Sequence, residues 1–205
     1  MMTAQVKKQA RLIGSAPGRC GIIGNPTDMY GGSVISCSLG ERAHVSVEPA
    51  EALVLESDQE TVVVRHRGQL QRAGDHCDIL RAVIAHEAWY GLRAHVRCWS
   101  ELPIASGLSS STAMVVAALW TLASYQDIHY EPHHFAEVAR SVELNHLGVV
   151  CGYQDQYMAT FGHLNYLDFR DKEFYRPVGT EPYATVERLS WNDQPLPFVL
   201  ANTGV

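Results

Sequence analysis

The sequence predicts an α+β fold, and three observations lead to this prediction. β-branched residues recur in roughly alternating positions through the first third of the chain, which is the period of a half-buried strand. Two long segments in the middle have helical character, and strand-like segments return near the end. This order favours a sheet with a separate helical layer over a regular alternation of parallel strands and helices.

The first half of the chain supplies paired strands and one helix. Segments 34–47 and 52–65 carry the alternating pattern of strands joined by turns. Asp75 caps a predicted helix that Gly91 ends, and apolar residues recur at helical spacing between them. A strand is predicted over 92–99, because apolar and polar residues alternate there.

The second half supplies two helices and the returning strands. One helix is predicted over 110–125, and another runs from Pro132, a favoured first helical residue, to about His146. The returning strands are predicted over 164–169, 184–189 and 198–201.

Length and composition exclude several classes of protein. A chain of 205 residues is long enough for one main domain with a core of good size. A net charge of −6 and the lack of any basic cluster argue against a nucleic-acid partner. The longest apolar run, 113–120, is too short to cross a bilayer, and the five cysteines form no C-x-x-C pair. We therefore expect a cytoplasmic protein with reduced thiols and no membrane partner.

The segment from Glu101 to Ala113, ELPIASGLSSSTA, is the most informative part of the sequence. Small residues let backbone N–H groups approach an anion, and the helix that follows directs its positive dipole end at the same place. The pattern predicts a phosphate-binding loop, although no Walker-type Gly-Lys-Ser/Thr follows. Hydroxyls from Ser109 to Thr112 are candidate magnesium ligands. An ordinary N-capped helix is the alternative.

A second candidate loop covers residues 16–32, APGRCGIIGNPTDMYGG. Glycines and prolines bracket Arg19, Asn25 and Asp28, and polar side chains in such loops are often the ones that hold substrates. Arg19 is a candidate for stabilising phosphate charge, and Asp28 for accepting hydrogen bonds from sugar hydroxyls. A simple hairpin turn is the alternative for this segment taken alone.

The third candidate segment, residues 143–162, contains Glu143 at a predicted helix end and Asp155 after a glycine-bearing loop. Two carboxylates placed in this way can converge on one pocket, one holding Mg²⁺ and the other near an attacking hydroxyl. Phosphoryl transfer depends mainly on positioning and charge neutralisation, so few further groups are needed. For either acid alone, a capping or solvated charge is the alternative.

Taken in this order, the three segments resemble the motifs of the GHMP kinases, the family of galactokinase, homoserine kinase, mevalonate kinase and phosphomevalonate kinase. PGRCGIIGNPTD resembles the first motif, and PIASGLSSSTA resembles the phosphate-binding second motif. The first motif is closest to that of the glucuronokinases, which also have a Gly-Asn-Pro-Ser/Thr-Asp core. Asn25 and Pro26 stand where galactokinases carry a glutamate and a histidine, which argues against galactose.

The resemblance implies a role for each matched residue. Asp155 would be the catalytic carboxylate and Arg19 its electrostatic companion, while Ser111, or alternatively Ser110, and Glu143 would hold Mg²⁺. The substrate would be held by Asn25, Asp28 and Gly152. The nucleotide would be bound by Pro103, Ser106, Gly107, Leu108, Ser109, Ser110 and Ser111.

The resemblance also implies a fold and an activity. Residues 1–195 would form the amino-terminal, ATP-binding domain, which is similar to domain 2 of ribosomal protein S5, and 196–205 would begin an absent carboxy-terminal domain. The implied activity is the transfer of phosphate from ATP, with Mg²⁺, to a sugar or glucuronate-like sugar acid, giving a 1-phosphate. Two alternatives remain: a kinase of a mevalonate-type alcohol, and a catalytically silent relative that binds sugar and nucleotide. The sequence predicts no oligomeric state.

Overall fold

A computed structural model gives the structure of the chain and describes residues 11–103, 106–172, 182–191 and 196–201. The strands are β1 (Leu12–Ile23), β2 (Ser33–Pro49), β3 (Leu53–Glu56), β4 (Thr61–Val64), β5 (Ala94–Ser100), β6 (Leu164–Asp168) and β7 (Thr185–Arg188). The α-helices are α1 (Asp78–His86), α2 (Ser110–Tyr125), α3 (Pro132–Val142) and α4 (Gln154–Phe161). Short helical segments are η1 (Thr27–Tyr30), η2 (Arg67–Leu70) and the π-helix η3 (Glu143–Leu147).

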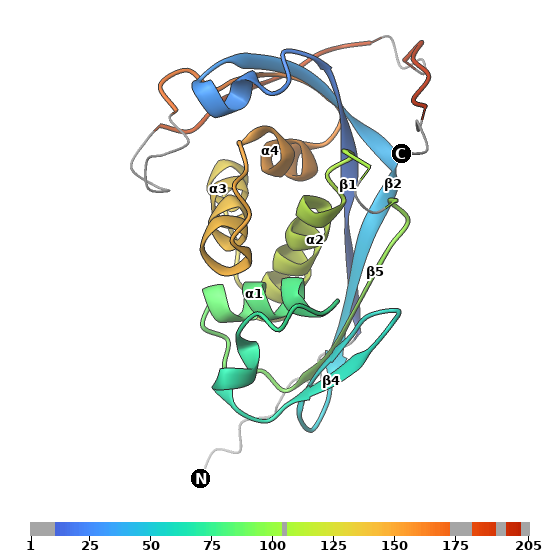
Figure 1. Cartoon of the computed structure of the whole chain (residues 1–205), viewed down its shortest axis with the longest axis vertical. Helices are drawn as coiled ribbons and strands as arrows, with labels where there is room; N and C mark the ends of the chain where they lie inside the picture. The colour runs from blue at the N-terminus through green and yellow to red at the C-terminus, as the bar shows by residue number, and fades with distance from the viewer. Residues whose placement is uncertain (1–10, 104–105, 173–181, 192–195, 202–205) are drawn as a thin grey trace.

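The sheet is built around the long strand β2. One edge of β2 pairs antiparallel with β1, and its other edge is shared by β6 near the start of the strand and β5 near its end. β3 lies parallel to β5, and β4 and β7 are the outer strands of the order β4-β3-β5-β2-β6-β7. Figure 1 shows the α-helices gathered on one side of this sheet. The α+β class is therefore confirmed.

The core lies between the sheet and α2, which packs against β1 and β2. Between Thr112 and Tyr125 only Trp120 and Ser124 are exposed, so α2 is buried on nearly every face. A helix that is apolar all round belongs in a core, and each fully buried Val, Leu or Met contributes about 1.5–3 kcal/mol. This burial fixes the position of the α2 amino terminus relative to the strands.

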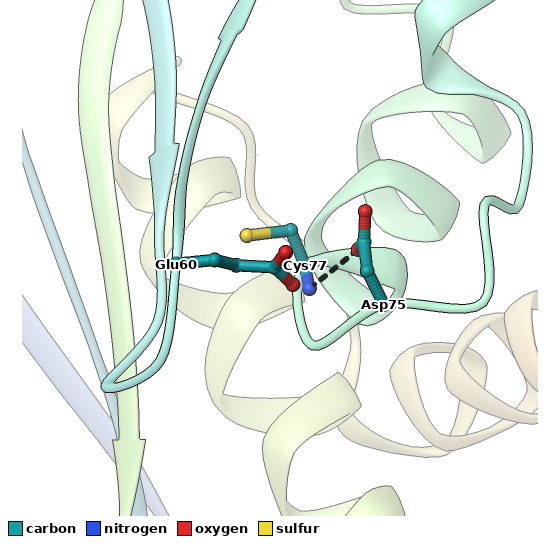
Figure 2. A group of neighbouring side chains, drawn as sticks. All are labelled: Glu60, Asp75 and Cys77. Carbon is teal, nitrogen blue, oxygen red and sulfur yellow. Dashed lines mark hydrogen bonds between the residues drawn. The ribbon is translucent and has the colours of Figure 1, made fainter.

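The prediction that Asp75 caps α1 is wrong, because Cys77 is the residue before the helix and no side chain caps it there. The helix begins at Asp78, and Asp75 accepts a hydrogen bond from the Cys77 N–H at 2.9 Å. Figure 2 shows Asp75 and Cys77 beside Glu60 at this corner. Burial raises the pKa of the Cys77 thiol to about 11, and hydrogen bonding from Arg81 lowers the pKa of Asp75. Because Arg81 already supplies a positive charge to Asp75, we assign this corner a structural role.

The prediction of a strand over 198–201 is wrong. Val199 is 94% exposed, Phe198 and Leu200 are also exposed, and no described strand pairs with this segment. Backbone groups of an extended segment need a neighbouring strand to pair with, and apolar content alone does not supply one. Whether 196–205 begins a second domain therefore stays a prediction.

Two elements that carry functional candidates were not predicted. Residues 12–23 form β1, although the sequence interpretation treated most of this stretch as a loop. Residues 154–161 form α4, and the helix predicted to reach His146 changes to a π-helix at Glu143. Both candidate acids therefore lie at helix starts, and Arg19 lies on a strand.

The five cysteines are free thiols. Among the described residues, no helix is both long enough and apolar enough to cross a membrane.

Candidate active site

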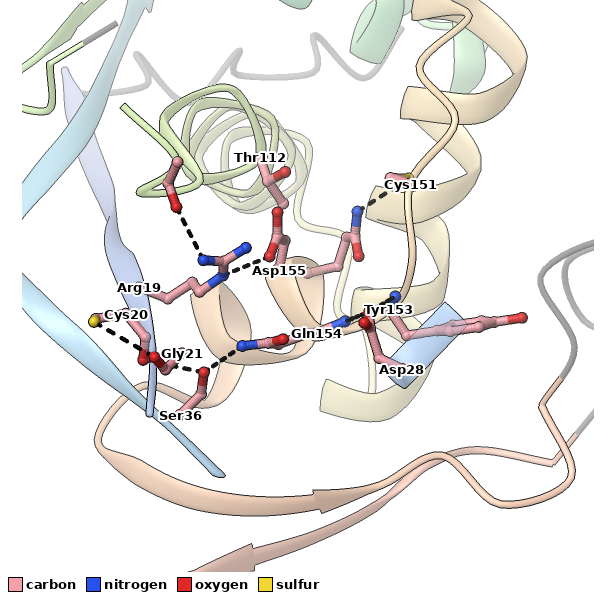
Figure 3. Close-up of polar contacts among 12 residues, drawn as sticks. Arg19, Cys20, Gly21, Asp28, Ser36, Thr112, Cys151, Tyr153, Gln154 and Asp155 are labelled. Carbon is pink, nitrogen blue, oxygen red and sulfur yellow. Dashed lines mark hydrogen bonds and ion pairs between the residues drawn. The ribbon is translucent and has the colours of Figure 1, made fainter. Parts of the chain in front are cut away.

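An ion pair between Arg19 and Asp155 forms the centre of the candidate site. The Arg19 Nε atom lies 2.6 Å from Asp155 Oδ1, and the two side chains are 13% and 28% exposed (Figure 3). Arg19 comes from β1 and Asp155 from the first turn of α4. The sequence interpretation named both residues, and the fold brings them together from positions that are 136 residues apart.

Arg19 also joins the small-residue loop to this pair. Its Nη1 donates to the Gly107 carbonyl at 3.0 Å, and its backbone N–H donates to the Leu108 carbonyl at 3.1 Å. A side chain at Gly18 would collide with Leu102 and with the Leu108 carbonyl, so β1 and the loop can approach this closely only over a glycine. The first and second motifs therefore form one structural unit.

A cavity of about 650 Å³ opens beside this unit. Arg19 and Asp155 lie in its wall. The loop and α2 contribute six of the predicted nucleotide-binding residues: Pro103, Ser106, Gly107, Ser109, Ser110 and Ser111. Leu108, the remaining one, is not in the lining but binds Arg19 through its carbonyl. Ile104 and Ala105 of the second motif lie outside the described residues.

The loop reaches α2 through backbone conformations that turn its amide groups toward one side. Gly107 has φ of 73°, and Ser109, which precedes the helix, has φ of 63°. Such left-handed positions next to helical ones create concave groups of N–H donors that bind anions. No side chain caps α2, and the buried Ser109 Oγ has no hydrogen-bond partner among the described residues. The first turn of α2 therefore keeps unsatisfied donors at the cavity wall.

Glu143 lies behind the first turn of α2, away from solvent. Its side chain accepts a hydrogen bond from the Thr112 hydroxyl at 2.8 Å and another from the Gln156 amide, and the residue is 1% exposed. Burial raises the pKa of Glu143 to about 7; the hydrogen bonds from Gln156 and Thr112 oppose this rise, and the charge of Asp155 adds to it. Glu143 is thus a buried acid that is influenced by the charges of both Asp155 and Arg140.

The groups near Thr112 fit the needs of Mg²⁺. Ser111 is exposed on the cavity wall, and the Glu143 carboxylate contacts the next residue of α2. Hydroxyl and carboxylate oxygens suit this ion, and each Glu143 oxygen accepts only one described hydrogen bond, which leaves lone pairs. A divalent cation would also offset the buried negative charge. The predicted ligands Ser111 and Glu143 are therefore chemically suitable.

None of the three predicted substrate-binding residues, Asn25, Asp28 and Gly152, belongs to the cavity lining. Asp28 is buried, and its Oδ2 accepts the backbone N–H groups of Tyr153 and Gln154 at 2.8 and 3.0 Å, at the start of α4. A Cβ at Gly152 would lie 2.0 Å from the same oxygen, so a glycine is required there. Asp28 and Gly152 thus hold α4, and with it Asp155, in place. A role in binding substrate stays a prediction for both.

Asn25, the third predicted substrate residue, is exposed beside the site. A Cβ at Gly21 would lie 3.2 Å from both the Asn25 Cβ and the Gln154 Nε2, so both side chains lie near Gly21. Gln154 donates to Ser36, while its own Oε1 is buried and has no described partner. Asn25 is therefore close to the ion pair through Gln154, the residue before Asp155.

The sequence interpretation assigned no role to Gln154 or Gln156, and it named Thr112 only as one of four candidate magnesium ligands, whereas its hydroxyl donates to Glu143. Both glutamines flank Asp155 in the run YQDQY, and this polar density at a helix start was the available signal. It also missed the far end of the cavity, where Asp58, His76 and other residues from separate turns meet. No local motif marks these positions, because only the tertiary fold brings them together.

The match to known families agrees with this arrangement. Residues 78–163, from α1 through α4, match the model described as the GHMP kinases N terminal domain. Residues 3–49, which include β1 and β2, match a galactokinase galactose-binding signature. This chain belongs to the GHMP kinase family. The predicted family and the predicted similarity to domain 2 of ribosomal protein S5 are thus confirmed.

Curated relatives of this GHMP kinase chain are galactokinases. The enzyme of Thermotoga maritima is 31% identical over 175 residues, which covers 82% of this chain and 50% of the relative. The enzyme of Chloroflexus aurantiacus is 30% identical over 179 residues, covering 81% of this chain and 45% of the relative. The chain therefore spans about half the length of the curated relatives it matches. The narrower likeness to glucuronokinases stays a prediction.

Solved structures of several small-molecule kinases share the fold. A D-glycero-D-manno-heptose 1-phosphate kinase from Bacteriodes thetaiotaomicron has a TM-score of 0.73 at 23% identity, covering 87% of this chain and 60% of that one. Lactococcus lactis galactokinase complexed with galactose has a TM-score of 0.70 at 21% identity, with coverage of 78% and 45%. Methanococcus jannaschii mevalonate kinase has a TM-score of 0.69 at 12% identity, with coverage of 89% and 56%. At these identities, the similarity concerns the fold alone.

Proposed function

We propose that this chain forms the nucleotide-binding half of a kinase that transfers the terminal phosphate of ATP to a hydroxyl of a sugar or sugar acid. One observation carries the proposal: Arg19 bridges Asp155 and the Gly107 carbonyl at the wall of a cavity of about 650 Å³. An acid, a cation and a phosphate-sized group of N–H donors thus occupy one site, and phosphoryl transfer needs little more.

The α2 amino terminus would hold the ATP phosphates. The backbone N–H groups of residues 109–111 have no partners within the helix, and the helix dipole favours negative charge there. Arg19 adds a positive charge that is fixed by its two side-chain hydrogen bonds. Apolar side chains in the same wall, including Leu102 and Met114, can contact a nucleobase, and the cavity volume lies in the range of ligand sites.

Asp155 would act on the attacking hydroxyl. The hydroxyl oxygen forms a bond to the terminal phosphorus of ATP, the bond from that phosphorus to the bridging oxygen breaks, and ADP leaves. The hydroxyl proton passes to the Asp155 carboxylate, which needs to lie within hydrogen-bond reach of it. Oδ1 already accepts from Arg19 and sets the orientation of the carboxylate, which leaves Oδ2 for the substrate.

Mg²⁺, when bound, would neutralise charge on the ATP phosphates. Ser111 on the cavity wall and Glu143 behind it would hold the ion. Thr112 and Gln156 orient the Glu143 carboxylate, as outer partners of metal ligands commonly do.

The substrate class follows from the sugar-kinase relatives and from Asn25. The galactokinases and the galactose-binding signature favour a sugar over a mevalonate-type alcohol. Asn25 is neutral and exposed at the position where galactokinases carry a glutamate. A neutral amide does not repel a carboxylate, so a glucuronate-like sugar acid, converted to its 1-phosphate, is the substrate we favour. Galactose is the second candidate, because residues 3–49 match the galactose-binding signature.

Product analysis tests this proposal. The full-length protein that contains this chain is incubated with ATP, Mg²⁺ and each member of a panel of sugars and uronic acids, and the phosphorylated product is identified by phosphorus NMR. We expect a sugar 1-phosphate from a uronic acid, and none from the Asp155→Asn variant. Asp127→Asn is the matched control, because Asp127 is 98% exposed and its φ of 58° suits asparagine. Phosphorylation of mevalonate alone, or ATP binding without any transfer, would overturn the sugar-kinase proposal.

A further inference from the structure

A second cavity, of about 420 Å³, lies beside α2. It is lined by Val116 and Trp120, which lie further along this helix than the phosphate loop. Its wall is formed by side chains from β1, β2, α2, the start of α3 and the end of α4. None of its lining residues also lines the candidate active-site cavity. The two cavities are therefore separate sites, and a volume of this size can hold a small organic molecule.

Aromatic rings form one wall of this cavity. Trp120 and Phe135 meet edge to face with ring centroids 6.1 Å apart, and Tyr130 lies 5.9 Å from Phe135. Phe161, at the end of α4, adds another ring to the lining. Trp120 is 56% exposed, although α2 is otherwise almost wholly buried. An exposed aromatic at the edge of an aromatic-lined cavity is suited to contact the face of a ligand ring.

A positive charge lies in the opposite wall. The Nε and Nη2 atoms of Arg42 donate to the hydroxyl and the carbonyl of Ser15, at 2.8 and 3.0 Å, so the guanidinium is fixed in place. Its Nη1 group makes no hydrogen bond within the described part of the chain. Ser38, four residues earlier on β2, also lines the cavity. A fixed guanidinium with a free N–H group can bind a carboxylate.

We propose that this second cavity binds a small ring compound that carries a carboxylate. The ring lies against Trp120 and Phe135, and the carboxylate accepts hydrogen bonds from Arg42. A neutral ligand of the same shape would contact the aromatic residues but would not offer a charged acceptor to the Nη1 group of Arg42. Preference for the acid is therefore the signature of this site.

The second cavity contacts the same elements that build the candidate active site. α4 carries Asp155 in its first turn and Phe161 at its end, and β1 carries both Arg19 and Ser15. α2 lines the active-site cavity with its first turns and the second cavity with Trp120. A ligand in the second cavity thus touches three elements that position the Arg19–Asp155 pair (Figure 1).

NMR titration of the whole chain tests the proposal, with 2-naphthoate as the acid probe and 2-naphthamide as its neutral counterpart. The four tryptophans give separate indole N–H signals, and Trp120→Phe identifies that of Trp120. Saturating ATP and Mg²⁺ are present, so that the probes do not enter the active-site cavity. We expect the Trp120 signal to shift, with the acid binding about tenfold or more tightly than the amide, as for a charge-assisted hydrogen bond.

Substitutions separate the contribution of the aromatic residues to probe binding from the contribution of the Arg42 charge. Arg42→Gln should remove the preference for the acid and leave amide binding unchanged, whereas Arg65→Gln, at an exposed arginine away from the cavity, should change neither affinity. Trp120→Ala should weaken both probes, and it keeps the test valid if Arg42→Gln fails to fold, because Trp120 is exposed. A Trp120 signal that does not move, equal affinities for acid and amide, or saturation only above about 1 mM would overturn the proposal.

Discussion

The two acids of the candidate site, Asp155 and Glu143, lie in contrasting surroundings. Asp155 opens onto the cavity and pairs with the guanidinium of Arg19 at 2.6 Å. Glu143 is 1% exposed and accepts hydrogen bonds from the Thr112 hydroxyl and the Gln156 amide, and the charge of Arg140 acts to lower its pKa. The same functional group is therefore held as an accessible acceptor paired with a guanidinium in one place and as a buried acid hydrogen-bonded to neutral groups in the other. This contrast supports our proposal that Asp155 acts on the substrate hydroxyl and that Glu143 holds a cation.

The largest effect expected is that of Asp155→Asn. Removing the proton acceptor while keeping the shape of the side chain should lower kcat by about 10²–10⁴-fold, the usual contribution of general base catalysis. Nucleotide affinity should change little, because the phosphate loop is untouched. ADP formation and isothermal titration measure the two quantities. A variant that keeps most of its kcat would remove Asp155 from the chemistry.

Glu143→Gln should change the pH dependence of stability. The folded-state pKa of Glu143, about 7, lies above the ordinary value of 4.5, so the folded protein holds this proton more tightly than the unfolded chain. Wild-type stability should therefore fall as pH rises from about 4.5 to about 7, by on the order of 3 kcal/mol from this group. The variant should match the wild type at pH 5 and exceed it at pH 8.

Urea unfolding at both pH values, without Mg²⁺, measures this difference, and the exposed Glu51→Gln is the control. The glutamine can be accommodated, because Gln156 has an unpaired Oε1 that can accept its amide. The same variant should weaken Mg²⁺-dependent nucleotide binding by about tenfold or more, as expected for a lost ligand. Unchanged Mg²⁺ dependence would restrict Glu143 to a structural role.

Arg19→Lys tests the role of the Arg19 guanidinium, which forms an ion pair with Asp155. Lysine keeps the charge but cannot span Asp155 and the Gly107 carbonyl with two fixed donors. Loss of one charge-assisted hydrogen bond should lower kcat/KM by about tenfold, with a smaller loss of nucleotide affinity. Steady-state kinetics and titration measure both, with Arg65→Lys as the control. Full activity with lysine would show that charge alone is needed.

The smallest effect is expected from Thr112→Val, which removes the hydroxyl that donates to Glu143. The loss should be about 1 kcal/mol of unfolding free energy at pH 8, where the buried carboxylate most needs its donors. Thr112→Ser should restore it. In the Glu143→Gln background the effect of Thr112→Val should change, and a strictly additive double mutant would contradict their coupling.

Much of the fold could be predicted because local patterns carried it. The α2 boundaries at Ser110 and Tyr125 follow from the small-residue loop before the helix and from its continuous apolar run. β1 was missed because Pro17 and the glycines at 14, 18 and 21 are poor strand formers, whereas close contact with α2 and the loop requires small residues there. Segment 198–201 was misjudged for the opposite reason: its residues suit a strand, but no described partner pairs with it.

The candidate site likewise contains residues that could be predicted from the sequence and residues that could not. Arg19, Asp155 and the small-residue loop were predicted because each stands in a recognisable motif, and the fold adds their contacts. That Asp28 caps α4 could not be predicted, because the acceptor and the N–H donors are 125 and 126 residues apart. The same holds for Thr112 and Gln156, which matter only because Glu143 lies between them.

A structure of the chain with Mg²⁺, a non-hydrolysable ATP analogue and a bound sugar acid tests the contrast between the two acids most directly. The account predicts the terminal phosphate at the N–H groups of residues 109–111, the ion between Ser111 and Glu143, and a substrate hydroxyl within about 3 Å of the Asp155 carboxylate. A sugar hydroxyl that approaches the phosphate far from Asp155, or an ion held by Asp155 with Glu143 left out, would contradict it.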